Sequence, residues 1–336
     1  MKVLWLRPST GDHVSVRRER IAEHLRERGV NVTIRDASGV NVFTAIRNAA
    51  FGDYDLIIGN VRIGLYIGYV LSRILRKPLF GDVSDSIEDM NHLPTPMYKA
   101  LRALEWWILG RVSTCFFVES ESFKAAEKRG LDPILAKNSV DFYRFNEPTD
   151  RSKQKARTIL LNHGISLDKP IATYIGSMVP HYHLSAVGAA AEVTPEWQFV
   201  FIGEERGAGI EGVVSGLENA HFLGAYEYEL MPGFLAYSDA GICLADREQP
   251  LKIMEYGATG LPTLGYSGKL RQNFSDEDLL FVDPEPPEIS EALQWISSNP
   301  EEASEYGRRL QRRAKENSWE VVAQKYYDQI VKLTKQ

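Results

Sequence analysis

Two ionisable side chains at helical spacing, Lys252 and Glu255, are the best candidates in this chain for chemistry on a phosphorylated ligand. They lie in residues 246–264, which read DREQPLKIMEYGATGLPTL and follow the apolar run 240–244. The pattern predicts a buried strand, a charged loop, a short helix opening at Pro250 and a second strand. A helix that begins just after a strand directs free N–H groups at its ligand, which favours phosphate. Lys252 would add a full charge there, and Glu255 would accept hydrogen bonds from a pair of sugar hydroxyls.

This stretch resembles the donor-binding segment of retaining family 4 glycosyltransferases. In that family a Glu is followed by seven residues and a second Glu, then by a helix of small residues and Gly-x-Pro. PLKIMEYGATGLP resembles the variant found in teichuronic-acid and related polysaccharide transferases. The resemblance implies that Glu255 holds the nucleotide ribose. The first Glu would fall at Arg247, so either Arg247 pairs with an acidic donor sugar or with phosphate, or Glu248 takes the carboxylate role.

Other segments resemble the same family. YIGSMVPHYHLSAVGAAAEVTPEWQFVFIGEE is similar to the opening of its nucleotide-binding domain, and NSVDFYRF to the segment that closes its N-terminal domain. Many family members place an Arg and a Lys on the diphosphate where this chain has Ser177 and Tyr182. His181 and His183 lie nearby, and they either substitute in part or are ordinary exposed loop residues. The loop 224–226 corresponds to the segment that holds the nucleotide base.

The residues expected to act on the donor follow from this resemblance. The catalytic candidates are Asp85, Arg247 and Lys252. The donor-binding candidates are Gly176, Ser177, His181, Glu204, Tyr226, Glu248, Pro250, Leu251, Lys252, Ile253 and Glu255.

The acceptor is expected to meet two loops near the start of the chain. PSTGDH follows the first strand, and GDVSDSIEDM resembles the family segment in which an Asp-x-His-Asp-like cluster faces the acceptor. The acceptor-side candidates are Gly11, His13, Arg17, Ser84 and Asp85. Two alternatives stay open: Gly11 and His13 could belong to a plain connecting loop, and Asp85 could cap the following turn.

Length and composition favour two soluble α/β domains. The chain has 336 residues, of which 44% are hydrophobic and 25% charged. The resemblance implies the GT-B fold, in which two Rossmann-like, doubly wound domains face a central cleft. We expect an N-terminal acceptor-side domain over residues 1–165, onto which the final helix at 317–336 packs back. Residues 166–316 would form the nucleotide-sugar-binding domain.

Several classes of protein are disfavoured. A net charge of −6 argues against a dedicated nucleic-acid binder. The first strand lacks the Gly-x-Gly-x-x-Gly turn of a dinucleotide site, and the two cysteines have no metal-ligand spacing. The resemblance implies that neither a metal nor a cofactor takes part, only a UDP- or GDP-linked sugar as co-substrate. No run approaches the roughly 20 apolar residues of a membrane span, which predicts a cytoplasmic protein.

Peripheral contact with the inner face of the membrane remains an alternative. Residues 98–109 form an amphipathic helix whose Trp106 and Trp107 either lie at a lipid surface or belong to the core. The helix at 300–316 is rich in arginine, which is either a solvated face or a membrane-facing patch.

The predicted activity is metal-independent transfer of a sugar, with retention, from a nucleotide sugar to a hydroxyl during glycan or polysaccharide biosynthesis. The acceptor would be a glycan or a lipid-linked molecule. Two alternatives are a catalytically inactive GT-B subunit that serves as a binding scaffold, and a sugar-nucleotide epimerase.

Overall fold

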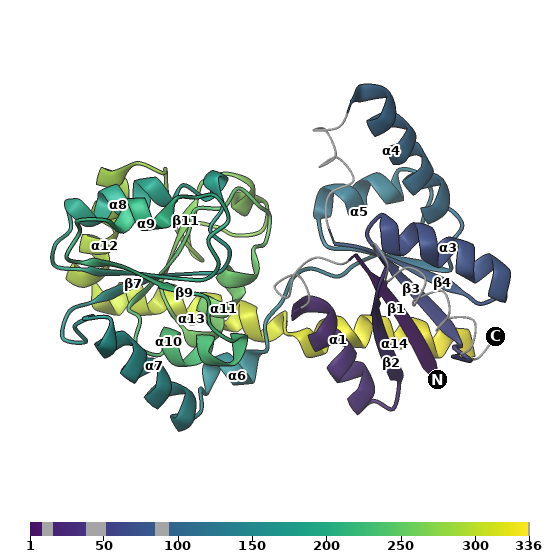
Figure 1. Cartoon of the computed structure of the whole chain (residues 1–336), viewed down its shortest axis with the longest axis horizontal. Coiled ribbons are helices and arrows are strands. Elements are labelled where there is room, and N and C mark those ends of the chain that lie inside the picture. The colour runs from purple at the N-terminus through teal and green to yellow at the C-terminus, as the bar shows by residue number, and fades with distance from the viewer. Residues whose placement is uncertain (9–15, 38–51, 85–93, 335–336) are drawn as a thin grey trace. The chain divides into compact units, whose positions relative to one another are not determined.

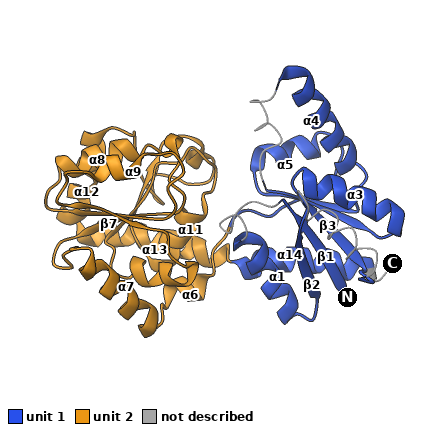
Figure 2. Cartoon of the chain, in the orientation of Figure 1, with its two compact units in different colours: residues 1–138, 319–336 blue, residues 139–318 orange. Residues whose placement is uncertain are grey.

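The computed structural model of the chain describes residues 1–8, 16–37, 52–84 and 94–334. These residues form two six-stranded parallel sheets, each covered by helices on both faces (Figure 1). The chain divides into unit 1, residues 1–138 and 319–336, and unit 2, residues 139–318 (Figure 2).

Unit 1 alternates strands and helices along the chain. Its strands are β1 (Lys2–Arg7), β2 (Asn31–Asp36), β3 (Leu56–Asn60), β4 (Leu79–Val83), β5 (Thr114–Phe117) and β6 (Pro133–Leu135). Its helices are α1 (Val16–Glu27), α3 (Ile63–Leu75), α4 (Thr95–Leu109), α5 (Ser120–Glu127) and α14 (Trp319–Thr334). The strand order β2-β1-β3-β4-β5-β6 reverses direction at β1, as in a doubly wound sheet.

The central strands β3 and β4 are fully buried, which agrees with their mainly apolar sequences LIIGN and LFGDV. One face of the sheet packs against α3, α4 and α5 through residues such as Leu65, Leu109 and Ala126. The other face packs against α14, whose Tyr326 ring stacks on Phe116 with 3.8 Å between centroids.

A buried polar network ties α14 to the carboxyl ends of the unit 1 strands. The Tyr326 hydroxyl donates to Asp82 Oδ1 at 2.8 Å, and Asn60 Nδ2 donates to Asp82 Oδ2 at 2.9 Å. Arg17 from α1 donates to the Tyr326 hydroxyl at 3.3 Å and lies 3.7 Å from Asp82 Oδ1. Asp82 is fully buried, so its charge depends on these partners.

Unit 2 repeats the same alternation. Its strands are β7 (Ile171–Ile175), β8 (Gln198–Ile202), β9 (Ala220–Gly224), β10 (Ala240–Cys243), β11 (Thr263–Tyr266) and β12 (Leu280–Val282). Its α-helices are α6 (Phe142–Asn146), α7 (Asp150–Asn162), α8 (Leu184–Glu192), α9 (Ile210–Val214), α10 (Met231–Leu235), α11 (Leu251–Thr259), α12 (Pro286–Ser298) and α13 (Pro300–Glu316). Three short 3-10 helices are η3 (Pro180–Tyr182), η4 (Tyr228–Leu230) and η5 (Lys269–Gln272).

Residues 139–165 belong to unit 2, whereas the sequence expectation placed the domain boundary at residue 165. Phe145 and Leu160 are buried in one apolar cluster with Ile253 and Leu310 of unit 2. The charged and helix-forming residues of this stretch suggest a linker with a helix when only the local sequence is considered. The buried face of α6 and α7, which decides the assignment, is visible only in the packed structure.

The unit 2 sheet has the order β12-β11-β10-β7-β8-β9, so the strand order reverses between β10 and β7. Helices α8, α9 and α12 cover one face, and α7, α10 and α11 cover the other (Figure 1). In open α/β sheets, ligands bind outside the carboxyl ends of the strands at such a reversal. The loop after β7 and the N-terminus of α11 meet at this point.

Candidate functional site

The helix α11 starts one residue after the predicted position Pro250 and stops at Gly260 as predicted. Pro250 occupies the N-cap position in extended conformation, and Leu251 is the first helical residue. Gly260 ends the helix at φ 76°, the left-handed conformation that glycine adopts without a Cβ clash. Pro250 makes no side-chain cap bond to the first turn, and the Ile253 N–H donates to the Pro250 carbonyl at 3.2 Å. The N-terminus of a helix in this position favours an anion at the carboxyl edge of the sheet.

Lys252 is buried between two aromatic rings. Its Nζ lies 3.8 Å from the centroid of Tyr174 and 4.9 Å from that of Tyr182, and the residue is only 8% exposed. Burial lowers the pKa of Lys252 to about 8, against the opposing influence of Glu255. The ammonium thus lies against two ring faces in a buried environment, where an arriving anion would stabilise the charge.

Glu255 lies one turn after Lys252 and is 5% exposed. Burial raises its pKa to about 7, while the nearby Tyr228 hydroxyl and the charge of Lys252 favour the ionised form. The two groups therefore change protonation close to neutral pH. A buried carboxylate that accepts hydrogen bonds is suited to bind a diol of a ligand.

The loop after β7 closes on Lys252. Gly176 adopts φ 111°, and a Cβ at this position would lie 3.3 Å from both Cε and Nζ of Lys252. Gly203 approaches it closely, since a Cβ there would meet the Gly176 carbonyl oxygen at 2.0 Å. The Ser177 carbonyl accepts from the Tyr174 hydroxyl at 2.6 Å, which holds that ring toward Lys252.

The other predicted donor residues differ in burial and in the residues that they contact. Tyr226 follows β9 and packs on Phe234, with 5.3 Å between ring centroids. Ile253 is fully buried in the core, and Leu251 and Pro250 lie at the start of α11. His181 is exposed in η3.

Glu204 lies two residues beyond the end of β8 and is paired within its own loop. Its carboxylate lies 2.7 Å from Arg206 Nη2, with both side chains partly exposed. Its backbone carbonyl accepts from the Met178 N–H at 2.9 Å, which ties the β8 loop to the β7 loop.

The two candidates for the first carboxylate differ in burial. Arg247 is exposed, and its backbone N–H donates to the Ala245 carbonyl at 2.9 Å. Glu248 is 5% exposed, and its carbonyl accepts from Asn273 Nδ2 at 2.9 Å. Of the two, Glu248 is the residue turned into the protein.

The predicted acceptor side is only partly described. Gly11, His13 and Asp85 lie outside the described residues. Arg17 belongs to the buried network with Asp82 and Tyr326, and it also donates to the Lys137 carbonyl at 3.0 Å. Ser84 accepts from Arg18 at 3.2 Å.

Three residues of the Lys252 environment were not named among the donor candidates, namely Tyr174, Tyr182 and Tyr228. Tyr174 lies within β7, and the signal available in the sequence was its place next to the strand's carboxyl end. Tyr228 is the first residue of η4, and its hydroxyl favours the ionised form of Glu255. None of these contacts follows from local spacing, because each joins segments far apart in the chain.

The arginine-rich helix α13 and the tryptophan-bearing helix α4 have different surroundings. In α13, Arg308, Arg309 and Arg312 all lie within 3.5 Å of Glu305. In α4, Trp106 stacks on Phe117, whereas Trp107 is 46% exposed. Within the described ranges, the structure contains no helix with the length and apolarity needed to cross a membrane.

Comparison with known proteins identifies the fold. No protein-family model matches this chain. No curated protein matches it either. HepE from Anabaena in complex with UDP-glucose is similar, with a TM-score of 0.77 at 16% identity, covering 99% of this chain and 100% of that chain. Sucrose-phosphate synthase from Thermosynechococcus elongatus has a TM-score of 0.79 at 17% identity, covering 99% of each chain.

An epimerase also shares the architecture. The UDP-GlcNAc 2-epimerase of Neisseria meningitidis, bound to UDP-GlcNAc, has a TM-score of 0.65 at 12% identity, covering 99% of this chain and 100% of that chain. The two parallel six-stranded sheets and these likenesses together place the chain in the α/β class with the GT-B fold of two Rossmann-like domains.

Proposed function

We propose that this chain is a glycosyltransferase that moves a sugar from a nucleotide sugar to a hydroxyl of a glycan or lipid-linked acceptor. The donor would be a UDP- or GDP-linked sugar, and no metal or further cofactor would take part. Transfer would retain the anomeric configuration, and the product would serve glycan or polysaccharide biosynthesis. The resemblance to retaining family 4 transferases and the likeness to HepE, whose structure holds UDP-glucose, support the proposal.

The observation that carries the proposal is the position of Lys252. A buried, aromatic-lined ammonium lies in the first turn of α11, at the reversal of strand order in the unit 2 sheet. As the sugar leaves, negative charge develops on the diphosphate, and a fixed cation with helix N–H groups would stabilise that charge. In this arrangement Lys252 and the α11 N-terminus hold the diphosphate, and Glu255 accepts from the ribose hydroxyls.

The remaining site residues are assigned less specific roles. The loop at Gly176 and Ser177 and the ring of Tyr226 would line the donor. The burial of Glu248 supports its role as the carboxylate for the donor sugar, with the exposed Arg247 beside it. The acceptor-side assignments are Asp85, Gly11, His13, Arg17 and Ser84.

The variant Arg247→Ala tests the role of Arg247 in donor selection. If it lowers activity only with acidic donor sugars, Arg247 selects the sugar; if activity is unchanged, Arg247 has no such role.

The direct test replaces Lys252 with methionine and measures binding of UDP, GDP and ADP by calorimetry. We expect one nucleotide to bind the wild-type chain, and Lys252→Met to weaken its binding at least tenfold. Because burial already disfavours the charge of Lys252, this variant should unfold at the same or a higher temperature. Lys155→Met, which removes an exposed lysine of α7, is the matched control. Equal nucleotide affinity in both variants would contradict the proposal.

A second candidate function is epimerisation of a nucleotide sugar. The fold likeness to the Neisseria epimerase favours it, as does the pair Lys252 and Glu255, whose pKa values of about 8 and about 7 suit proton transfer. Conversion of a nucleotide sugar in the absence of any acceptor would indicate this activity. Binding of nucleotide sugars without either reaction would instead indicate an inactive scaffold subunit.

A further inference from the structure

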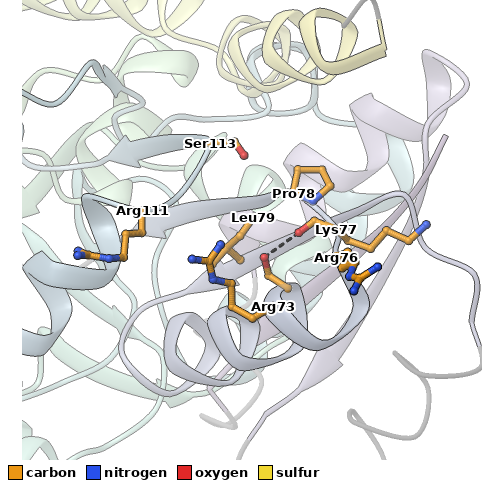
Figure 3. A pocket seen from close by; sticks show the side chains of 8 residues that line it. Arg73, Arg76, Lys77, Pro78, Leu79, Arg111 and Ser113 are labelled. Atoms are coloured by element: carbon orange, nitrogen blue, oxygen red, sulfur yellow. Dashed lines mark hydrogen bonds between the residues drawn. The ribbon is translucent and has the colours of Figure 1, made fainter.

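A pocket of about 370 Å³ opens at the amino-terminal edge of the unit 1 sheet. Four basic side chains line it: Arg73, Arg76 and Lys77 from the end of α3 and the turn after it, and Arg111 from the segment before β5 (Figure 3). This edge is opposite to the carboxyl ends of the strands, where Asn60 and Asp82 lie. The pocket is therefore separate from Arg17 and Ser84, the acceptor-side candidates that the structure describes.

The positive charges of this pocket have no carboxylate partner within the part of the chain that the structure describes. Among the residues that the structure describes, no Asp or Glu forms an ion pair with Arg73, Arg76, Lys77 or Arg111. The C-terminal ends of α3 and α4 contribute only about half a negative charge each. The basic side chains of α13, in contrast, share Glu305 and Asp278. The pocket is thus strongly positive in a chain whose net charge is −6.

Aromatic rings link the pocket to an exposed apolar surface. The Arg111 guanidinium lies 4.0 Å from the Trp107 ring centroid, and Trp107 meets Tyr69 edge-on at 5.4 Å. Arg73 lies 5.5 Å from the Tyr69 ring centroid. These contacts join α3 and α4 into one surface.

The apolar part of this surface is unusually exposed. Ile74 is 70% and Val70 is 55% exposed, and their spacing of four residues places them on one face of α3. On α4, Trp107 is 46% and Leu104 is 41% exposed, again one turn apart. Protruding aliphatic and indole side chains beside unpaired arginines are typical of proteins that insert at the boundary of headgroups and acyl chains.

We propose that the four-cation pocket and the exposed faces of α3 and α4 dock this chain on an anionic phospholipid membrane. A headgroup phosphate would enter the pocket and accept hydrogen bonds from the guanidinium groups, which match phosphate oxygens in a bidentate manner. Ile74, Val70, Leu104 and Trp107 would enter the interfacial layer around it. This inference concerns unit 1 and does not depend on the proposed nucleotide site.

The test is co-sedimentation of the full chain with vesicles of phosphatidylcholine alone and of phosphatidylcholine mixed with phosphatidylglycerol. We expect binding to the mixed vesicles only, weakened by salt. Replacing both Arg73 and Arg76 with glutamine should lower the partition coefficient roughly 30-fold, since each basic side chain at an anionic surface contributes about fivefold. Ile74→Ser should lower it severalfold. The substituted side chains are exposed, so all variants should unfold at the wild-type temperature.

Two matched controls distinguish the effect of this surface from a general effect of losing positive charge or an exposed apolar side chain. Replacing Arg308 and Arg312 of α13 with glutamine removes the same charge outside the pocket, and Val193→Ser removes a side chain that is 56% exposed in unit 2. Both controls should bind vesicles like the wild type. The proposal fails if mixed vesicles bind no chain, or if the pocket and control variants bind them equally. Binding of inorganic phosphate in the pocket without vesicle binding would also overturn it and would indicate a soluble anion as ligand.

Discussion

At the scale of single residues, Lys252 and Glu255 show how burial prepares a site for an anion. Both side chains are nearly inaccessible, and burial moves the pKa of Lys252 down and that of Glu255 up, so the two values approach each other. Holding both charged in the free protein costs stability, because each charged form has lost most of its water. A bound diphosphate would offset this cost at Lys252.

The pKa of Lys252 predicts a specific pH dependence of nucleotide binding. In the free chain Lys252 loses its proton as pH rises through about 8, whereas the bound diphosphate favours the protonated form. The affinity for the nucleotide should therefore be constant below that pKa and fall by up to about tenfold per pH unit above it. Calorimetry between pH 7 and 9 measures this slope. Lys252→Met shares any titration of the ligand itself, so a slope of equal size in that variant would contradict the assignment.

Gly176 provides a second test at residue scale. In Gly176→Ala the new Cβ would lie 3.3 Å from Cε and Nζ of Lys252, so the ammonium must move. The backbone at φ 111° adds strain of roughly 1 kcal/mol or more. We expect nucleotide affinity to fall at least tenfold together with this loss of stability.

The control for this variant is Gly164→Ala. Gly164 also has positive φ, at 75°, but a Cβ there meets nothing within 4 Å. It should lose similar stability and keep its nucleotide affinity. Equal affinity in the two variants would show that the space beside Lys252 does not matter for binding.

At the scale of elements, α14 is held to unit 1 by a hydrogen-bond network rather than by apolar contact alone. Tyr326 inserts its ring beside Phe116 and Trp5, and its hydroxyl reaches the fully buried Asp82. The last helix of the chain thereby becomes part of the sheet formed at the start of the chain. Packing of α14 against α1 and the sheet explains why unit 1 includes residues 319–336.

Removing the Tyr326 hydroxyl alone should measure how much the hydrogen-bond network contributes to the free energy of unfolding. Tyr326→Phe keeps the ring but leaves Asp82 with one partner fewer, which should cost about 1–3 kcal/mol of unfolding free energy. Urea unfolding followed by circular dichroism gives this value. Tyr327→Phe alters the neighbouring, partly exposed tyrosine and should change stability by less than about 0.5 kcal/mol. Equal values would mean that the network contributes nothing.

At the scale of the whole molecule, the candidate sites are distributed over two units with separate hydrophobic cores. Unit 2 carries the buried Lys252 and Glu255, and unit 1 carries the predicted acceptor loops and the four-cation pocket. Each unit is a doubly wound sheet with apolar clusters of its own. A ligand that binds unit 2 should therefore stabilise that unit first.

Hydrogen exchange can locate this stabilisation. With the nucleotide that binds, exchange should slow in residues 176–183 and 245–256 and stay unchanged in β3 and β4 of unit 1. The two segments contain the loop after β7 and the first turns of α11. Protection confined to unit 1 would show that Lys252 and Glu255 do not belong to the nucleotide site.

Much of the architecture could be predicted from local pattern. Apolar runs bounded by polar residues predicted the strands at 171–175 and 240–244, and Pro250 and Gly260 predicted the limits of α11. These signals are local, because helix periodicity and turn chemistry depend on residues within a few positions. The same signals could not assign residues 139–165 to unit 2, since that depends on which apolar face packs against which core.

The sequence by itself determined the α/β class, the alternating order of elements and a lysine and a glutamate one turn apart after a strand. Only the tertiary structure decided their environment: Tyr174 and Tyr182 around Lys252, Tyr228 on Glu255, and Glu248 rather than Arg247 turned inward. It also brought Arg111 to the three basic residues at the end of α3. Burial and charge depend on contacts between distant segments, so side-chain spacing along the chain cannot supply them.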